Sequence, residues 1–200
     1  DKVTYSRLVQ RGYDTLADTY TDRRPVSDLE DQILTEFCAR LPDSGVVLDA
    51  GCGGETPTTE ALSEHFDVVG VDISRAQIEL ATNQLPAEAF VRGDMHQLPL
   101  QHSTVDGICA LYSLIHAVDH QSVLDEFGRV LEPDGYLLLT TGVSGETSID
   151  TDWFGSGERM LLNVPGRDES LRLLENAGFD NLTEYTHSTD PDPHDPFYLL

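Results

Sequence analysis

The hydrophobic residues of this chain fall into short continuous runs, and each run ends at a polar or glycine-rich turn before a stretch with helical spacing begins. An apolar run of this kind is typical of a strand buried on both faces of a parallel sheet. Apolar residues that recur every three or four positions predict helices that cover such a sheet. The predicted strands span residues 46–49, 68–72, 90–94, 105–111, 136–140, 181–187 and 197–200. The predicted helices span residues 5–20, 29–41, 58–65, 75–85, 124–131 and 168–177.

Turn residues separate these elements. Ser74 follows the second strand and is a suitable N-cap for the helix that begins at Arg75. The sequence Pro133-Asp134-Gly135 predicts a turn, because neither a helix interior nor a strand interior accommodates it. The stretch from Gly142 to Asp152 is predicted to be a long polar loop. Strands that alternate with helices in this way predict an α/β fold with a doubly wound sheet.

The first predicted strand leads into a turn that is suited to a nucleotide ligand. The apolar run 46–48 is followed by Asp49 and then by Gly51-Cys52-Gly53-Gly54. Glycines let the backbone pass close to a ligand. The second strand ends at Asp72, twenty-one residues after Gly51, where a carboxylate can accept hydrogen bonds from ribose hydroxyls.

The charges beside this turn favour a cationic ligand over a pyrophosphate. A dinucleotide site reads G-x-G-x-x-G and holds a pyrophosphate at a helix N-terminus. This chain instead places Asp49 before its glycines and Glu55 after them, and acids suit an ammonium or sulfonium group. On these residues the chain resembles the class I S-adenosylmethionine-dependent methyltransferases, whose first motif reads acid-x-Gly-x-Gly-x-Gly. Glu55 departs from the family pattern, because it stands where the third glycine is usual.

Three further segments carry the same resemblance, which runs from about Tyr13 to Leu200. Asp94 ends a short strand where the family commonly faces the adenine amino group. Residues 129–139 read RVLEPDGYLLL and are similar to the family's RVL-x-P-x-G-x-LLL segment. Residues 13–20 read YDTLADTY and resemble an element that folds over the cofactor as a lid in relatives. Simple packing of this element against the sheet is the alternative.

The resemblance implies a three-layer, Rossmann-like sheet of seven strands, mostly parallel with the last antiparallel, and helices on both faces. It implies a single methyltransferase domain over residues 1–200, with a helical cap at 1–42, a cofactor-binding core at 43–142 and substrate-side strands and a helix at 143–200. The implied cofactor is S-adenosylmethionine. The residues expected to bind it are Asp49, Gly51, Cys52, Gly53, Asp72, Ile73, Asp94, Met95, Leu111 and Tyr20.

Methyl transfer is an in-line displacement at a sulfonium carbon, so it depends mainly on alignment and desolvation. A base is needed only where the acceptor must lose a proton. His116 is a candidate general base near neutral pH, with a structural histidine as the alternative, and Tyr112 is the second catalytic candidate. The family places its acceptor pocket just past the fourth strand, where Ser113 and Asp119 also lie. The candidates to shape or cover that pocket are Tyr13, Tyr20, Trp153, Phe154 and Met160.

The charge of the chain limits its partners. Asp and Glu number 36 against 12 Lys and Arg, the net charge is −24, and Lys2 is the single lysine. Such self-repulsion is largely screened at about 1 M salt, where the Debye length is about 3 Å. Because the acids are spread along the chain, we interpret them as adaptation to a saline cytosol rather than as a surface for a basic partner. Phosphate binding requires clustered cations, so the charge argues against nucleic acid.

The cysteines predict neither a disulfide framework nor a metal site. Cys38, Cys52 and Cys109 form no C-x-x-C pair, and no spacing suggests zinc. Their odd number and the lack of a signal peptide predict a cytoplasmic protein. No apolar run approaches the roughly 20 residues of a membrane span.

These features predict an enzyme that transfers a methyl group from S-adenosylmethionine to an oxygen, nitrogen or carbon atom of a small organic acceptor. One alternative is a tRNA-nucleoside methyltransferase of the same fold, which the charge disfavours. Another is a non-catalytic module that binds S-adenosylmethionine, which Glu55 suggests. A nicotinamide-dependent oxidoreductase is disfavoured by the acid in the loop. The acceptor and the oligomeric state stay open.

Overall fold

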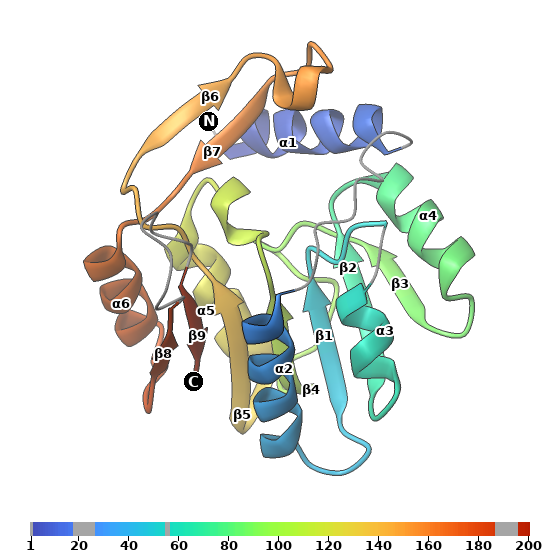
Figure 1. Cartoon of the computed structure of the whole chain (residues 1–200), viewed down its shortest axis with the longest axis vertical. Helices are drawn as coiled ribbons and strands as arrows, with labels where there is room; N and C mark the ends of the chain where they lie inside the picture. The colour runs from blue at the N-terminus through green and yellow to red at the C-terminus, as the bar shows by residue number, and fades with distance from the viewer. Residues whose placement is uncertain (1, 18–26, 55–56, 187–195) are drawn as a thin grey trace.

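A computed structural model covers the whole chain and describes residues 2–17, 27–54, 57–186 and 196–200. Its centre is a seven-stranded sheet with the order β3-β2-β1-β4-β5-β9-β8 (Figure 1). The strands are β1 (Val46–Ala50), β2 (Asp67–Asp72), β3 (Ala89–Arg92), β4 (Val105–Ala110), β5 (Leu131–Thr140), β8 (Thr183–Tyr185) and β9 (Phe197–Leu199). Strands β1 to β5 pair in parallel, and β9 is antiparallel to both β5 and β8. The predicted mostly parallel, seven-stranded sheet with an antiparallel last strand is confirmed.

The strand order creates a switch point at the centre of the sheet. Strand β1 lies between β2 and β4, so the chain builds one half of the sheet before it crosses to the other. Asp49 in β1 pairs with Gly70 of β2 and with Cys109 of β4. Ligands of open α/β sheets bind outside the carboxyl ends of the strands at such a point.

Two apolar cores cover the two faces of the sheet. On one face, α2 (Asp28–Arg40) and α3 (Pro57–Ser63) bury Phe37 and Leu62. On the other face, α5 (His120–Val130) and α6 (Arg167–Asn176) bury Phe127 and Leu174. Complete burial of one such side chain stabilises the fold by about 1.5–3 kcal/mol. Helix α4 (Arg75–Gln84) packs beside β2 and β3, so helices cover both faces, as predicted.

Helix α1 (Lys2–Leu16) and a two-stranded hairpin form a third layer beyond the tips of the central strands (Figure 1). The hairpin pairs β6 (Thr147–Asp150) with β7 (Met160–Asn163). A small core joins helix and hairpin through Val9, Met160 and Leu161. A Cβ on Gly12 would lie 2.6 Å from the Met160 Cε, so α1 and β7 approach closely where the helix lacks a side chain.

The hairpin corrects the long loop predicted between Gly142 and Asp152. Residues of that stretch form β6, and the short 3₁₀ helix η2 (Trp153–Gly155) lies in the connection to β7. The stretch is too short and too polar to show a strand period of its own. It becomes a strand because β7, anchored by two buried side chains, offers it hydrogen-bonding partners.

Several element ends also differ from their predicted positions. Helix α1 covers residues 2–16 rather than 5–20, and residues 18–20 lie outside the described part of the chain. Helix α5 begins at His120 rather than at residue 124, because the Asp119 carboxylate caps it by accepting the Ser122 N–H at 3.2 Å. The turn predicted at Pro133-Asp134-Gly135 lies inside β5 as an irregularity, where Asp134 has a φ of 64° and the register with β4 shifts.

None of the helices in the described part of the chain combines the length and the apolar character that a membrane span requires.

Candidate functional site

A cavity of about 470 Å³ lies at the switch point, between the carboxyl ends of the central strands and α1. The predicted cofactor-binding and catalytic residues that the structure describes all line this cavity. They are Asp49, Gly51, Cys52, Gly53, Asp72, Ile73, Asp94, Met95, Leu111, Tyr112 and His116. Tyr20, the remaining predicted residue, lies outside the described residues. The fold therefore gathers into one site residues that come from four separate strand ends.

The glycine turn after β1 forms the floor of the cavity. Gly51 has a φ of +81°, and its N–H donates to the Val71 carbonyl at 2.7 Å. A Cβ on Gly51 would lie 2.3 Å from the Ser113 Cβ, so both the backbone conformation and the packing require glycine there. Gly53 has a φ of +63°, and a Cβ there would meet no atom within 4 Å. Gly53 thus borders open space, as expected of a residue beside a ligand.

Asp49 is a buried carboxylate at the base of this turn, with 4% of its surface exposed. It accepts a hydrogen bond from the Thr59 hydroxyl at 2.6 Å. Burial raises the pKa of Asp49 to about 6, the Thr59 bond opposes that change, and the charge of Asp72 adds to it. The carboxylate is held in place, but its charge lacks a counterion among these neighbours.

Asp72 lies at the end of β2 on the other side of the turn. Its Oδ2 accepts the Gly53 N–H at 3.1 Å, and its Oδ1 accepts the Ser74 N–H at 2.8 Å. Burial is the main cause that raises the pKa of Asp72 to about 6, these backbone bonds oppose it, and Asp14 adds repulsion. A cation placed between Asp49 and Asp72 would favour the ionised form of both.

Asp94 follows β3 and forms a pair with His96. The Asp94 Oδ1 accepts the backbone N–H of His96 at 2.9 Å and lies 2.6 Å from the His96 Nδ1. Burial raises the pKa of Asp94, but hydrogen bonds from His96 and from the Ser6 hydroxyl of α1 lower it below its usual value. Asp94 is therefore ionised and oriented at the edge of the cavity.

Buried polar nitrogens without a partner mark the same cavity. Among the described residues, three buried side-chain nitrogens lack a hydrogen bond: Gln77 Nε2, His96 Nε2 and Trp153 Nε1. Gln77 and His96 line the cavity. An unmade hydrogen bond of a buried group costs about 1–3 kcal/mol, so a polar ligand in the cavity would relieve it. Sequence reasoning missed both residues, although Gln77 stands three positions after the Ser74 cap and so in the first turn of α4, beside the glycine loop.

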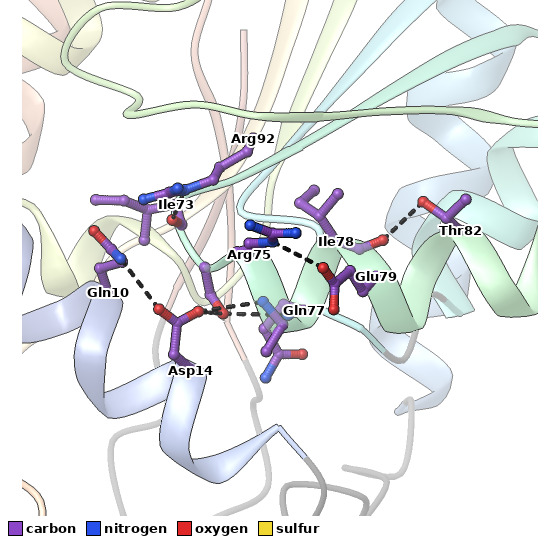
Figure 2. A network of polar contacts seen from close by, with 11 residues as sticks. Gln10, Asp14, Ile73, Arg75, Gln77, Ile78, Glu79, Thr82 and Arg92 are labelled. Carbon is purple, nitrogen blue, oxygen red and sulfur yellow. Dashed lines mark hydrogen bonds and ion pairs between the residues drawn. The ribbon is translucent and has the colours of Figure 1, made fainter.

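Helix α1 is attached through Asp14 to the start of α4, beside the cavity. The Asp14 carboxylate accepts the Ser74 hydroxyl at 2.6 Å and the Ala76 N–H at 3.2 Å. It also accepts the Gln10 amide at 3.1 Å, a bond that Figure 2 shows. Burial raises the pKa of Asp14, and these bonds lower it further than burial raises it. A carboxylate at the N-terminus of α4 also interacts favourably with the helix dipole. The contact fixes the position of α1 above Asp72 and Ile73.

The predicted acceptor side is built around His116, in the short 3₁₀ helix η1 (Leu114–His116). The His116 Nδ1 lies 2.8 Å from the Leu161 carbonyl, and its Nε2 lies 2.8 Å from the Tyr13 hydroxyl. Trp153 packs edge-on against the imidazole, with ring centroids 5.6 Å apart. Burial lowers the pKa of His116, and the Leu161 carbonyl partly offsets that effect. His116 is therefore neutral at pH 7 and can accept a proton.

The other acceptor-side candidates have different surroundings. Tyr112 has a φ of 56°, and its hydroxyl donates to Glu30 of α2 at 3.3 Å, while the residue lines the cavity. Ser113 also lines the cavity, and its hydroxyl donates to the Ala50 carbonyl at 2.8 Å. Asp119 is the cap of α5 and does not line the cavity. In the described residues no group of three His, Cys, Asp or Glu side chains is arranged to hold a metal ion.

Known proteins show the same combination of fold and motifs. The family described as "Methyltransferase domain" matches residues 48–139. An O-methyltransferase of Aspergillus nomiae is 31% identical over 153 residues, which cover 72% of this chain and 68% of that protein. An O-methyltransferase of Pyrenophora dematioidea is 31% identical over 143 residues, or 66% of this chain and 53% of that protein. The chain thus spans about half the length of some of the relatives that it matches.

Solved structures agree on the fold. A S-adenosylmethionine-dependent methyltransferase from Leishmania major superimposes with a TM-score of 0.72 at 18% identity, over 98% of this chain and 81% of that one. The geranyl diphosphate C-methyltransferase from Streptomyces coelicolor was solved with Mg²⁺, geranyl diphosphate and S-adenosylhomocysteine. It superimposes with a TM-score of 0.69 at 17% identity, over 98% of this chain and 96% of that one.

Proposed function

Because the chain belongs to the family of class I S-adenosylmethionine-dependent methyltransferases, we propose that it transfers the methyl group of S-adenosylmethionine to an oxygen, nitrogen or carbon atom of a small organic acceptor. One observation carries this proposal. Eleven residues predicted from separate motifs line a single cavity, where the carboxylates of Asp49 and Asp72, with pKa values of about 6, flank a glycine turn. Such a site suits a nucleoside that also carries positive charge.

The residues present fit the cofactor. Asp72 would hold the ribose hydroxyls, Asp49 the positively charged methionyl end, and Asp94 with Met95 the adenine. The two buried nitrogens that lack partners, Gln77 Nε2 and His96 Nε2, support a polar ligand in the same space. When bound, S-adenosylmethionine supplies a methyl group on a sulfonium sulfur, a strong electrophile.

The contribution of the protein is enclosure and alignment. Helix α1 and the β6–β7 hairpin cover the carboxyl ends of the strands (Figure 1). Removing water and fixing two reactants in line are the main sources of rate in a displacement without a covalent intermediate. The three polar contacts of α1, through Ser6, Tyr13 and Asp14, support the interpretation of this helix as a lid over simple packing.

The acceptor is proposed to be small and uncharged. The described lining of the cavity includes carboxylates and hydroxyls but no Lys or Arg side chain. Several relatives are named O-methyltransferases, which supports an oxygen acceptor. A tRNA acceptor is opposed by the net charge of −24 and by the size of the cavity. The free cysteines support a reducing, cytoplasmic location, and the charge supports a saline one.

The test combines binding and turnover in high salt. Saturation with S-adenosylmethionine or S-adenosylhomocysteine at about 100 times the dissociation constant should stabilise the protein by roughly 2.7 kcal/mol. Transfer of a radiolabelled methyl group to a panel of phenols, alcohols and amines then separates an enzyme from a binding module. Stabilisation by NAD but by neither sulfur nucleoside would contradict the proposal.

A further inference from the structure

Two side chains at the acceptor end of the cavity form a continuous hydrogen-bonded chain. The Tyr13 hydroxyl lies 2.8 Å from the His116 Nε2, and the His116 Nδ1 lies 2.8 Å from the Leu161 carbonyl oxygen. A carbonyl oxygen only accepts hydrogen bonds, so the proton of the neutral imidazole must sit on Nδ1. Nε2 is then the acceptor, and the Tyr13 hydroxyl donates to it. The order of donors is therefore fixed from Tyr13 to His116 to Leu161.

The hydrogen-bonded chain is buried at its Leu161 end and borders the cavity at its Tyr13 end. Tyr13 and His116 both line the cavity, whereas Leu161 belongs to the small core under the hairpin. The Tyr13 and His116 rings meet edge to face, with centroids 5.3 Å apart, and Trp153 closes the other side of the imidazole. Tyr13, Leu161 and Trp153 hold the imidazole on three sides, and its Nε2 is hydrogen-bonded to Tyr13, which itself lines the cavity.

The charged groups on the surrounding elements are engaged elsewhere. Asp14 of α1 is bonded to the first turn of α4, and Arg11 of α1 is paired with Glu158 at 3.1 Å. The groups that face His116 are thus the Tyr13 phenol from α1, the Leu161 carbonyl from β7 and the Trp153 indole from η2. A neutral imidazole in these surroundings is free to accept one proton through its Nε2.

The chemistry of the acceptor decides whether such a chain has a use. A neutral amine already carries the lone pair that attacks a methyl group, so it needs no base before transfer. A neutral hydroxyl is a weak nucleophile until its proton leaves. A buried path that removes one proton from the cavity therefore points to a hydroxyl acceptor.

We propose that Tyr13 is the catalytic residue that takes the proton of an uncharged hydroxyl acceptor, a phenol or an alcohol, while its own proton passes to the His116 Nε2. The inference rests on the proposed function and specifies the acceptor of that same site. In the balanced step the acceptor O–H bond breaks and an O–CH₃ bond forms. The methyl–sulfur bond breaks, and its electron pair stays on sulfur. The positive charge moves from sulfur to imidazole, so the total charge of the cavity is unchanged.

His116 acts through Tyr13 and is a positioning residue as well as the final holder of the proton. If the pair served only to attach α1 to η1, loss of the bond would weaken every reaction of the site equally. If the pair moves a proton, the loss would depend on how acidic the acceptor is. This difference gives the test.

The experiment compares the wild type with Tyr13→Phe, His116→Gln and the control Tyr5→Phe, which removes an exposed hydroxyl from the same helix outside the cavity. Calorimetric titration with S-adenosylhomocysteine first shows whether the cofactor site is intact. Methyl transfer is then measured with phenol and with 4-nitrophenol, which is largely ionised at pH 8. We expect Tyr13→Phe and His116→Gln to lower kcat/KM for phenol at least about a hundredfold. In the same two variants kcat/KM for 4-nitrophenol should fall less than about fivefold. Tyr5→Phe should match the wild type in kcat/KM for both substrates.

A second readout does not depend on turnover. The ¹⁵N spectrum of the protein loaded with S-adenosylhomocysteine should show His116 as the Nδ1–H tautomer, and Tyr13→Phe should shift its Nε2 signal. Equal losses of kcat/KM for both phenols would overturn the proton path and show that the pair only attaches α1 to η1. Transfer to amines alone, or to no hydroxyl compound while S-adenosylhomocysteine still binds, would overturn the acceptor class. Failure to bind S-adenosylhomocysteine at all would instead count against the proposed function.

Discussion

The Asp72 carboxylate accepts the backbone N–H of Gly53 at 3.1 Å, and this bond joins the end of β2 to the glycine turn after β1. Both sides of the proposed cofactor site therefore depend on one side chain. The same carboxylate also orients the start of α4 through the Ser74 N–H. Burial is the main cause that raises its pKa to about 6, and the charge of Asp14 adds to the effect.

Replacement of Asp72 by Ala should weaken the binding of S-adenosylmethionine about ten- to hundredfold, because a charge-assisted hydrogen bond contributes about 1.5–3 kcal/mol. Asp94→Ala should cost less, since adenine also gains from stacking and backbone contacts. Calorimetric titration of both variants measures the difference. Asp67→Ala, which removes an exposed acid at the other end of β2, is the control. An unchanged dissociation constant in folded Asp72→Ala would refute the assignment.

The affinity for S-adenosylmethionine should rise with pH between about 5 and 7, because the cation binds best when both Asp49 and Asp72 are ionised. Asp49 and Asp72 have pKa values of about 6 against a usual 3.8. The stability of the free protein should change with pH in the opposite direction. The protonated forms of Asp49 and Asp72 contribute fully to stability below pH 3.8, and this contribution is lost as the pH rises through 6. Asp72→Asn should flatten both dependences. Titrations in buffers of different ionisation enthalpy measure the protons released, and no release at pH 6 would contradict the prediction.

Substitution of Gly51 by Ala should destabilise the protein more than substitution of Gly53. Both residues have positive φ, which costs a side-chain-bearing residue about 1–2 kcal/mol. At Gly51 the new methyl group also meets the Ser113 Cβ at 2.3 Å, and such overpacking costs about 1–3 kcal/mol more. Chemical denaturation gives both free energies of unfolding. Equal losses of unfolding free energy in the two variants would show that Ser113 moves away without cost.

Removal of the Asp14 carboxylate should loosen α1. Asp14→Ala deletes three hydrogen bonds, two of them to the first turn of α4, and loss of a helix cap costs about 0.5–2 kcal/mol. Since α1 covers the cavity, S-adenosylhomocysteine should also dissociate faster, which stopped-flow fluorescence can follow. Gln10→Ala deletes only the bond within α1 and should change neither quantity measurably. Dissociation at the wild-type rate in Asp14→Ala would argue that α1 is not a lid.

Stability should climb steeply with salt. With a net charge of −24, repulsion among acids opposes folding when the screening length is about 10 Å, at 0.1 M, and weakens as that length falls to about 3 Å at 1 M. Above that range salt adds a smaller gain by strengthening apolar burial. Melting temperatures in KCl from low to molar concentration provide the measurement. A flat or falling curve would remove the halophilic interpretation and call for a specific basic partner.

Local patterns were sufficient to predict the central strands and the residues that line the cavity at their ends. Continuous apolar runs marked the central strands, and the glycines and acids at their ends marked the cavity, because parallel strands bring their carboxyl ends to one edge. Gly51, Asp72 and Asp94 could therefore be placed before any tertiary contact was known, and each lines the cavity.

The tertiary structure decided the acceptor side and the cover. The Tyr13–His116 bond joins residues 103 positions apart, and the Asp14–Ser74 bond joins residues 60 positions apart. The β6–β7 hairpin has too little apolar character to show a strand period, and Gln77 and His96 became notable only when burial left them without partners. Hydrophobic periodicity and turn chemistry act between near neighbours in the chain. Hydrogen bonds between distant elements depend on how those elements pack, which no single segment of the sequence records.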